Sequence, residues 1–301
     1  MTATMSPENG SFLGKMENNC MEHGSHHKAA GVRCQVWGLI GNGYRQMARY
    51  EEAEQFLQRA LDHAIATFGE EDEETGAARN HLGVLYKYTG DFDKAEKLYR
   101  EALTHFVARQ GEENSFAATL YHNLGGLEHA RGAYAAGEPH ARKAWEIRCR
   151  LLGSDHPATL ADEAAYAGVL DGLERYGESE PIYRRALAVF EKIYGPEHYE
   201  VAVNLNNLAN VRFARGDYKE AEELFRRALA IKEKTLGADH PDTALTANNL
   251  GVLLQAQGQQ DEARALFSSA LAAFEPQLSE NHPYVRMARE NLAKVKGVGY
   301  H

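Results

Sequence analysis

The sequence predicts an all-α protein in which six helical hairpins stack side by side and one C-terminal helix covers the last of them. The first observation is an Ala-Leu or Ala-Trp pair that recurs every 42 residues, at Ala60-Leu61, Ala102-Leu103, Ala144-Trp145, Ala186-Leu187, Ala228-Leu229 and Ala270-Leu271. A constant period of this size is typical of stacked-repeat proteins. The second is composition, because residues that favour helices are abundant and only 8 of 301 residues are proline.

Each repeat has the pattern of two helices, which is clearest over residues 74–115. Apolar residues at helical spacing indicate a first helix, at Ala78, Leu82, Leu85 and Tyr86. This helix is expected to stop at Gly90, since glycine adopts the left-handed conformation that ends helices, and Asp91 is a suitable N-cap for the next one. The second helix carries one apolar stripe, at Ala95, Tyr99, Ala102 and Leu103.

Small residues recur at two positions of the repeat. One position lies on the first helix of each hairpin, at Gly41, Gly83, Gly125, Ala167, Ala209 and Gly251. The other lies on the second helix, at Ala53, Ala95, Gly137, Ser179, Ala221 and Ala263. We expect the helix axes to approach closely there, with a large side chain of one helix filling the space above the small residue of another.

Histidines also follow the 42-residue period, in the linkers between hairpins, at His156-Pro157, His198, His240-Pro241 and His282-Pro283. Proline is well tolerated at the first position of a helix, so these segments are expected to start the next hairpin. A metal array is the alternative interpretation. We favour the structural role because one whole hairpin separates each histidine from the next.

The ends of the chain differ from the repeats. Residues 1–28 are polar and aperiodic, and we expect a disordered tail there, followed by a solenoid over 29–296 and a short tail over 297–301. The solenoid should end in a capping helix that begins at Pro283. A small group of metal-ligand residue types lies in the N-terminal tail, and an unstructured histidine-rich segment is favoured over metal binding; the group comprises Cys20, His23, His26 and His27.

Composition argues against several classes of partner. The formal net charge of −10 disfavours a nucleic-acid-binding surface. No apolar run approaches the roughly 20 residues that span a bilayer, and the N-terminus lacks the apolar stretch of a secretory signal. The three cysteines are scattered and do not form a disulfide framework. We therefore expect a cytoplasmic protein without nucleic-acid or membrane partners.

No sequence motif for catalysis is present. The chain has no glycine-rich phosphate loop, no paired-cysteine zinc pattern and no nucleophile elbow. The repeats also occupy nearly all of the residues. We therefore predict no enzymatic activity, no catalytic residue, no metal site and no cofactor.

The repeat unit resembles the tetratricopeptide repeat. The resemblance rests on Leu-Gly in the first helix, a Gly-Asp-aromatic turn, the Ala-x-x-x-aromatic-x-x-Ala-Leu pattern of the second helix and the following Gly-x-x-His-Pro; Trp37 stands where the family pattern begins with tryptophan. The 42-residue form with His-Pro linkers is similar to the repeats of kinesin light chains and their bacterial relatives. This resemblance implies a right-handed α-α superhelix in which the first helix of each hairpin lines the concave side.

The same resemblance places one stripe of the first helices in a peptide-binding groove. The candidate groove residues are Asn42, Arg45, Asn80, Lys87, His122, Asn123, Asn206, Asn207, Asn210, Phe213, Asn248 and Asn249. Asparagine amides both donate and accept, which suits an extended peptide backbone. The alternative is that these amides bond neighbouring helices. The carboxylate-gripping clamp of some family members is not expected, since its lysine positions hold Gly38, Asn80 and His122.

The middle of the predicted groove differs from its ends. Small or weakly polar residues gather there, at His122, Gly126, Ala164, Ala165 and Gly168, and Pro139 and Pro181 share one position of two second helices. Repeat divergence is the interpretation we favour. The alternative is a changed curvature or an apolar pocket at this point.

These observations predict a non-enzymatic adaptor that binds an extended peptide or a short helix of another protein. A self-associating scaffold is the alternative function, because the N-terminal face near Val36 and Leu39 is less clearly capped than the C-terminal one. We favour a monomer.

Overall fold

The structure is a computed structural model that describes residues 31–296. The expected N-terminal tail with its Cys20, His23, His26 and His27, and the tail over 297–301, lie outside the described residues. None of the described helices is long and apolar enough to cross a membrane.

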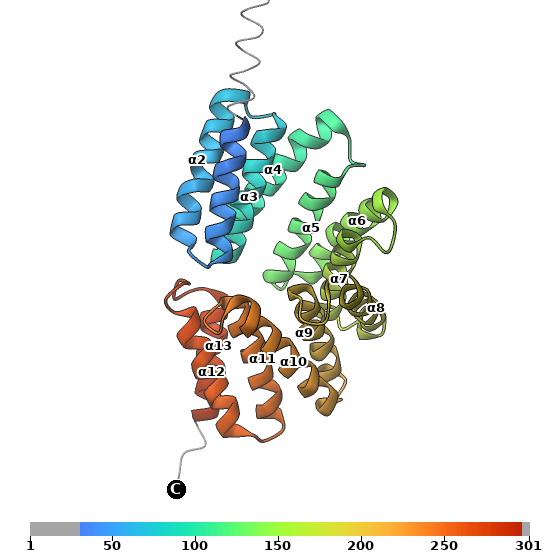
Figure 1. Cartoon of the computed structure of the whole chain (residues 1–301), viewed down its shortest axis with the longest axis vertical. Helices are drawn as coiled ribbons and strands as arrows, with labels where there is room; N and C mark the ends of the chain where they lie inside the picture. The colour runs from blue at the N-terminus through green and yellow to red at the C-terminus, as the bar shows by residue number, and fades with distance from the viewer. Residues whose placement is uncertain (1–30, 297–301) are drawn as a thin grey trace, which may run out of the picture.

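Residues 31–296 form thirteen helices and no strand, arranged as six hairpins and a final helix (Figure 1). The first helices of the hairpins, here called A helices, are 31–46, α3 (Glu73–Thr89), α5 (Ser115–Ala130), α7 (Pro157–Gly172), α9 (Tyr199–Ala214) and α11 (Pro241–Ala256). The second, or B, helices are α2 (Tyr50–Phe68), α4 (Phe92–Gln110), α6 (Tyr134–Leu152), α8 (Tyr176–Tyr194), α10 (Tyr218–Leu236) and α12 (Gln260–Phe274). The predicted capping helix is α13 (Pro283–Lys296). The all-α, right-handed solenoid predicted from the sequence is confirmed.

The small residues allow the close packing that the sequence predicts. A Cβ atom added to Gly83 would lie 2.7 Å from Cε1 of Tyr99, and one added to Gly251 would lie 2.7 Å from Cε1 of Phe267. Both rings are fully buried. The B helix of each of these hairpins thus inserts an aromatic ring directly over the glycine of its A helix, where no side chain fits.

The turn inside each hairpin needs one residue with positive φ. Glycine supplies it in four of the described hairpins, for example Gly90 with φ 83°. Ala48 and Glu174 stand at the same position of the first and fourth hairpins, with φ of 55° and 58°. Non-glycine residues pay a steric penalty in this conformation, so these two turns are strained.

The linker histidines begin α7, α9, α11 and α13, as the structural interpretation predicts. The Nδ1 atoms of His156, His198, His240 and His282 each accept a hydrogen bond from the backbone N–H two residues later, at 3.1–3.2 Å. This is the N-cap interaction, which satisfies an N–H group that the helix itself leaves unpaired.

The superhelix brings its two ends back together, which the sequence analysis did not predict. In Figure 1 the N-terminal hairpins face the C-terminal ones across the molecule. The Nε2 atom of His240 lies 3.0 Å from the carbonyl oxygen of Gln46, and Nε2 of His282 lies 3.1 Å from that of Tyr88. One buried apolar cluster joins the same ends, since it contains Tyr50 together with Val285.

Candidate functional site

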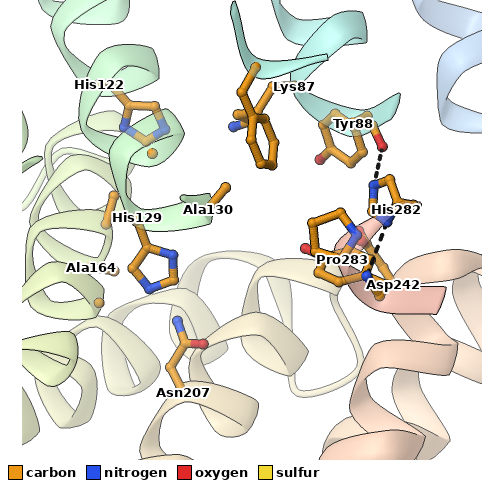
Figure 2. A pocket seen from close by; sticks show the side chains of 15 residues that line it. Lys87, Tyr88, His122, His129, Ala130, Ala164, Asn207, Asp242, His282 and Pro283 are labelled. Atoms are coloured by element: carbon orange, nitrogen blue, oxygen red, sulfur yellow. Dashed lines mark hydrogen bonds between the residues drawn. The ribbon is translucent and has the colours of Figure 1, made fainter. Parts of the chain in front are cut away.

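A cavity of about 340 Å³ lies on the concave side of the superhelix, between the A helices (Figure 2). This volume is at the lower end of the range for ligand sites. Most of its lining comes from α3, α5, α7, α9, α11 and α13. The A helices therefore line the concave side, as the family resemblance implied. The lining residues used below are Lys87, Tyr88, His122, Gly126, His129, Ala164, Ala165, Gly168, Asn207, Asp242 and His282.

Small residues form one wall of this cavity. They are Gly126 from α5 and Ala164, Ala165 and Gly168 from α7. A Cβ atom on Gly126 would contact only the Nζ atom of Lys87, at 3.5 Å, so the space beside this glycine is open. The small residues of the middle repeats therefore do more than record repeat divergence, the interpretation favoured from the sequence; they create a pocket, which was the alternative.

The prolines noted with those residues lie farther into their helices than a helix start. Pro139 is the sixth residue of α6 and Pro181 the sixth residue of α8. Each lacks the N–H that would bond the preceding turn, so each of these B helices loses one backbone hydrogen bond.

Lys87 and His129 supply the basic groups of the cavity. Burial and the nearby Arg45 guanidinium lower the pKa of Lys87 to about 8. Burial and the positive charge of Lys87 lower the pKa of His129. Within residues 31–296, Lys87 has no hydrogen-bond or ion-pair partner. Its Nζ atom lies 5.7 Å from the centre of the Tyr88 ring. The unpaired ammonium group of a lysine that lines a cavity can bind an anion.

The concave surface continues beyond the cavity as an open groove of about 510 Å³. Five predicted site residues line it, at Asn42, Arg45, Asn80, His122 and Asn123. His122 lines both spaces, which adjoin at this side chain and are together called the channel below. Its Nδ1 atom lies 2.8 Å from Oδ1 of the buried Asp162, whose other oxygen accepts from Arg148 at 2.8 Å. The concave side therefore has a narrow cavity and a wider groove, and the binding of a peptide there stays a prediction.

Several asparagines bond one another across neighbouring A helices. Asn123 donates to Asn80 at 2.7 Å, Asn249 donates to Asn206 at 3.2 Å, and Asn291 donates to Asn248 at 3.1 Å. In each pair the two residues are 43 positions apart, so the bonds repeat along the stack. This is the structural role that the sequence analysis left open as the alternative.

Burial decides the role of one asparagine outright. Asn248 is only 1% exposed, and its Nδ2 also contacts the Sδ atom of Met287 at 3.6 Å. The assignment of Asn248 to the groove surface is therefore wrong, because its amide faces the adjacent helix rather than the channel. Asn80, Asn123 and Asn206 are also largely buried and already paired, which reduces what they can offer a peptide.

The remaining predicted groove residues keep exposed surface. Asn207 lines the cavity, while Asn210 and Asn249 are half-buried. Phe213 is half-buried and packs against Tyr218, with ring centres 5.6 Å apart. Their part in binding stays a prediction.

The sequence analysis missed Tyr88, Asp242, His282 and Tyr284, which complete the cavity. They come from two ends of the chain, and the wall they form exists because the superhelix closes. The linker histidines were noted in the sequence, but nothing there indicated that two of them also bond the opposite end. Among the described residues no group of three or more His, Cys, Asp or Glu side chains is placed to hold a metal ion.

Comparison with known proteins agrees with the repeat architecture. Models of the tetratricopeptide repeat match residues 32–106, 117–158, 163–234, 200–275 and 242–297. No curated protein matches the chain.

Similar solved structures are repeat proteins of the same kind. BtubC (BKLC) from P. vanneervenii is 23% identical with a TM-score of 0.51, and the match covers 85% of this chain and 93% of that one. A Podosopora anserina structure of nearly identical kinesin-light-chain repeats is 21% identical with a TM-score of 0.53, covering 68% and 97%. A Rap protein complexed with competence and sporulation factor is 15% identical with a TM-score of 0.58, covering 88% and 75%.

The family models together match most of the chain, and the described helices follow the same repeat boundaries. The protein belongs to the tetratricopeptide repeat family, and its structural neighbours include repeats of the kinesin light chain type.

Proposed function

We propose that this protein is a non-enzymatic adaptor that captures a segment of a partner protein in its concave channel. The observation that carries the proposal is the concave cavity with its adjoining groove, lined by one helix from each of several hairpins. In the cavity Lys87 and Asn207 present polar groups beside small residues. Such a combination of an apolar wall and a few polar groups is typical of ligand sites. The cytoplasm is the compartment in which we expect it to act.

One structural neighbour supports a binding role for a protein of this fold. The Rap protein of similar fold was solved in complex with competence and sporulation factor. The likeness is in the fold, and the choice of ligand depends on side chains. The residues of this channel therefore have to be tested directly.

The test fills the channel without disturbing the helix packing. Gly126→Trp places a large ring in the open space beside Lys87, and Gly177→Trp is the matched control at an exposed site of α8 with nothing within 4 Å. Both variants are compared with the native chain as baits in cell extract, after circular dichroism has shown equal helix content. We expect Gly126→Trp to lose the captured partners and Gly177→Trp to retain them. Equal capture by both would remove the channel from the binding function.

A second function, self-association, is favoured by one surface. The first helix exposes Val32, Val36 and Leu39, and the turn after it exposes Met47, with exposed fractions of 58%, 44%, 72% and 60%. The residue equivalent to Val36 in the next hairpin, Ala78, is 5% exposed because the preceding B helix covers it. The first hairpin has no such cover within the described residues, and a second copy of the chain would bury this apolar stripe.

Sedimentation velocity over a range of protein concentrations tests this second function. If the stripe joins two copies, the native chain forms dimers and Leu39→Glu shifts it to a monomer. A native chain that stays monomeric at all concentrations would exclude self-association and leave the adaptor function alone.

A further inference from the structure

Lys87 is a cation without a partner at the centre of the molecule. Basic side chains elsewhere are commonly paired; Arg131, for example, lies within 3.1 Å of carboxylate oxygens of Asp93, Glu96 and Glu128. Lys87 has no carboxylate oxygen within 4.0 Å among the described residues. Lys87 is half-buried and lines the cavity without a counter-charge, so its ammonium group is available to an anion that enters the cavity.

Two further polar side chains face the same space from other helices. His129 projects from α5 and Asn207 from α9 (Figure 2). The Oδ1 atom of Asn207 accepts from Asn206 at 3.3 Å, which leaves its Nδ2 group to donate toward the cavity. Lys87 and Asn207 therefore offer N–H groups to one ligand from two separate hairpins, while the His129 ring bonds the backbone of Gly168.

The acidic groups of the cavity do not neutralise Lys87. Asp242 is the only carboxylate among the lining residues, and one of its oxygens accepts from the Tyr199 hydroxyl at 2.7 Å. It lies more than 4.0 Å from Nζ of Lys87 on the wall made by the C-terminal hairpins. The Asp242 carboxylate raises the pKa of Lys87, but burial and the Arg45 guanidinium outweigh this effect, so the pKa of Lys87 is still lowered to about 8.

The small residues of the cavity wall limit which ligand side chain can lie beside a group bound to Lys87. Gly126, Ala164, Ala165 and Gly168 form an open, largely apolar wall next to Lys87. A medium-sized apolar side chain fits against such a wall, whereas a second charged group would find no partner there.

We infer that the cavity binds a carboxylate group of the captured segment, with Lys87 as its ion-pair partner, Asn207 as a further donor and an apolar neighbouring side chain against Gly126 and Gly168. This inference rests on the proposed function and names the chemistry of its ligand. A terminal carboxylate and the side chain of an acidic residue would both supply the group.

The test uses three small peptides as probes of the full-length chain. Acetyl-Ala-Leu has a terminal carboxylate, acetyl-Ala-Leu-amide has none, and acetyl-Glu-Leu-amide carries one only on a side chain. Saturation-transfer NMR titrations give the affinity of each. We expect at least one charged probe to bind about tenfold or more tightly than the neutral one, as charge-assisted hydrogen bonds require. The better of the two charged probes identifies the source of the carboxylate.

Two variants assign the effect to the cavity. Lys87→Met removes the charge with little change of shape, and Lys97→Met makes the same change of net charge at a site 76% exposed on α4. Lys87→Met should reduce the affinity of the charged probe to that of the neutral one, and Lys97→Met should leave it unchanged. Equal binding of all three probes, no binding of any, or equal effects of the two variants would overturn the inference.

Failure of the carboxylate inference can be distinguished from failure of the proposed function. If Lys87→Met captures the partner as well as the native chain while Gly126→Trp does not, the channel binds a segment but not through a carboxylate. If Gly126→Trp also retains capture, the proposed function itself fails.

Discussion

The Nε2 atom of His282 lies 3.1 Å from the carbonyl oxygen of Tyr88, a residue 194 positions earlier in the chain. The same offset separates His240 from Gln46. Gln46 and Tyr88 belong to the last turns of the first helix and α3, where backbone carbonyls have no partner within the helix. His240 begins α11 and His282 begins α13, so the C-terminal end of one helix meets the N-terminal end of another. The opposite ends of helix dipoles favour this arrangement.

His282 should therefore contribute more to stability than a linker histidine that is only an N-cap. His282→Ala loses the cap and the bond to Tyr88, whereas His156→Ala loses the cap alone. We expect His282→Ala to lower the free energy of unfolding by about 1 kcal/mol more than His156→Ala, the usual net value of a hydrogen bond. Urea titration measures the difference, and small-angle scattering should show a larger radius of gyration for His282→Ala only. Identical behaviour of the two variants would mean that the ends do not hold each other in solution.

Gly90 should be needed for closure as well as for its turn. A Cβ atom there would lie 2.9 Å from Cδ2 of His282, whereas Gly216, with nearly the same φ, has nothing within 4 Å. Both Gly90→Ala and Gly216→Ala incur the backbone penalty of a positive φ, about 1–2 kcal/mol. Only Gly90→Ala also pushes the two ends apart. Thermal melting should show a greater loss for Gly90→Ala, and equal losses would exclude a contribution from the contact.

Closure should weaken in acid. Burial lowers the pKa of His282 in the folded chain, while the unfolded chain has the ordinary value of about 6.5. The stabilisation is therefore complete above about pH 6.5 and is lost as the pH falls toward the folded-state pKa. Protonation also removes the Nδ1 lone pair that caps α13. Unfolding midpoints between pH 8 and pH 5 should fall for the native chain and fall less for His282→Ala; parallel curves would contradict this.

Replacing Glu174 by glycine should stabilise the protein. Glu174 has a φ of 58° at a turn position where Gly90, Gly132, Gly216 and Gly258 stand in other hairpins. Glu174→Gly relieves the steric strain, and the flexibility of glycine in the unfolded chain offsets part of the gain. We expect a net increase of about 0.5–1 kcal/mol in the free energy of unfolding by urea titration. A decrease would show that the Glu174 side chain has a stabilising role that its exposed position does not suggest.

Binding of the charged peptide probe should depend on the protonation of Lys87. Its pKa of about 8 keeps the ammonium form below that pH, whereas an ordinary lysine stays charged to about pH 10. The affinity for acetyl-Ala-Leu or acetyl-Glu-Leu-amide, whichever binds more tightly, should therefore decline above about pH 8. The neutral probe serves as the control, because its affinity should stay level. A charged probe that binds equally at pH 7 and pH 9.5 would exclude Lys87 as its partner.

The sequence determined the hairpins of this protein because each one is specified by itself and its nearest neighbour. The 42-residue spacing of Ala60-Leu61 and its repeats, Gly83 below Tyr99, and the His-Pro linkers are local signals, and the structure confirms what they predict. The placement of Lys87 on the concave side was implied by the resemblance to the tetratricopeptide repeat, applied to this regular spacing.

Only the tertiary structure decided that the superhelix closes and that a cavity forms where its ends meet. Closure depends on the small rotation between each hairpin and the next, which adds up over the whole stack. The sequence of one repeat does not reveal this total rotation. The distances between neighbouring A helices are likewise set by packing, which is why Asn248 lies against Asn291 instead of facing the channel. A periodic sequence shows which residues lie on the same face of a helix. Whether that face contacts another helix, a ligand or the far end of the chain depends on how all the hairpins pack together.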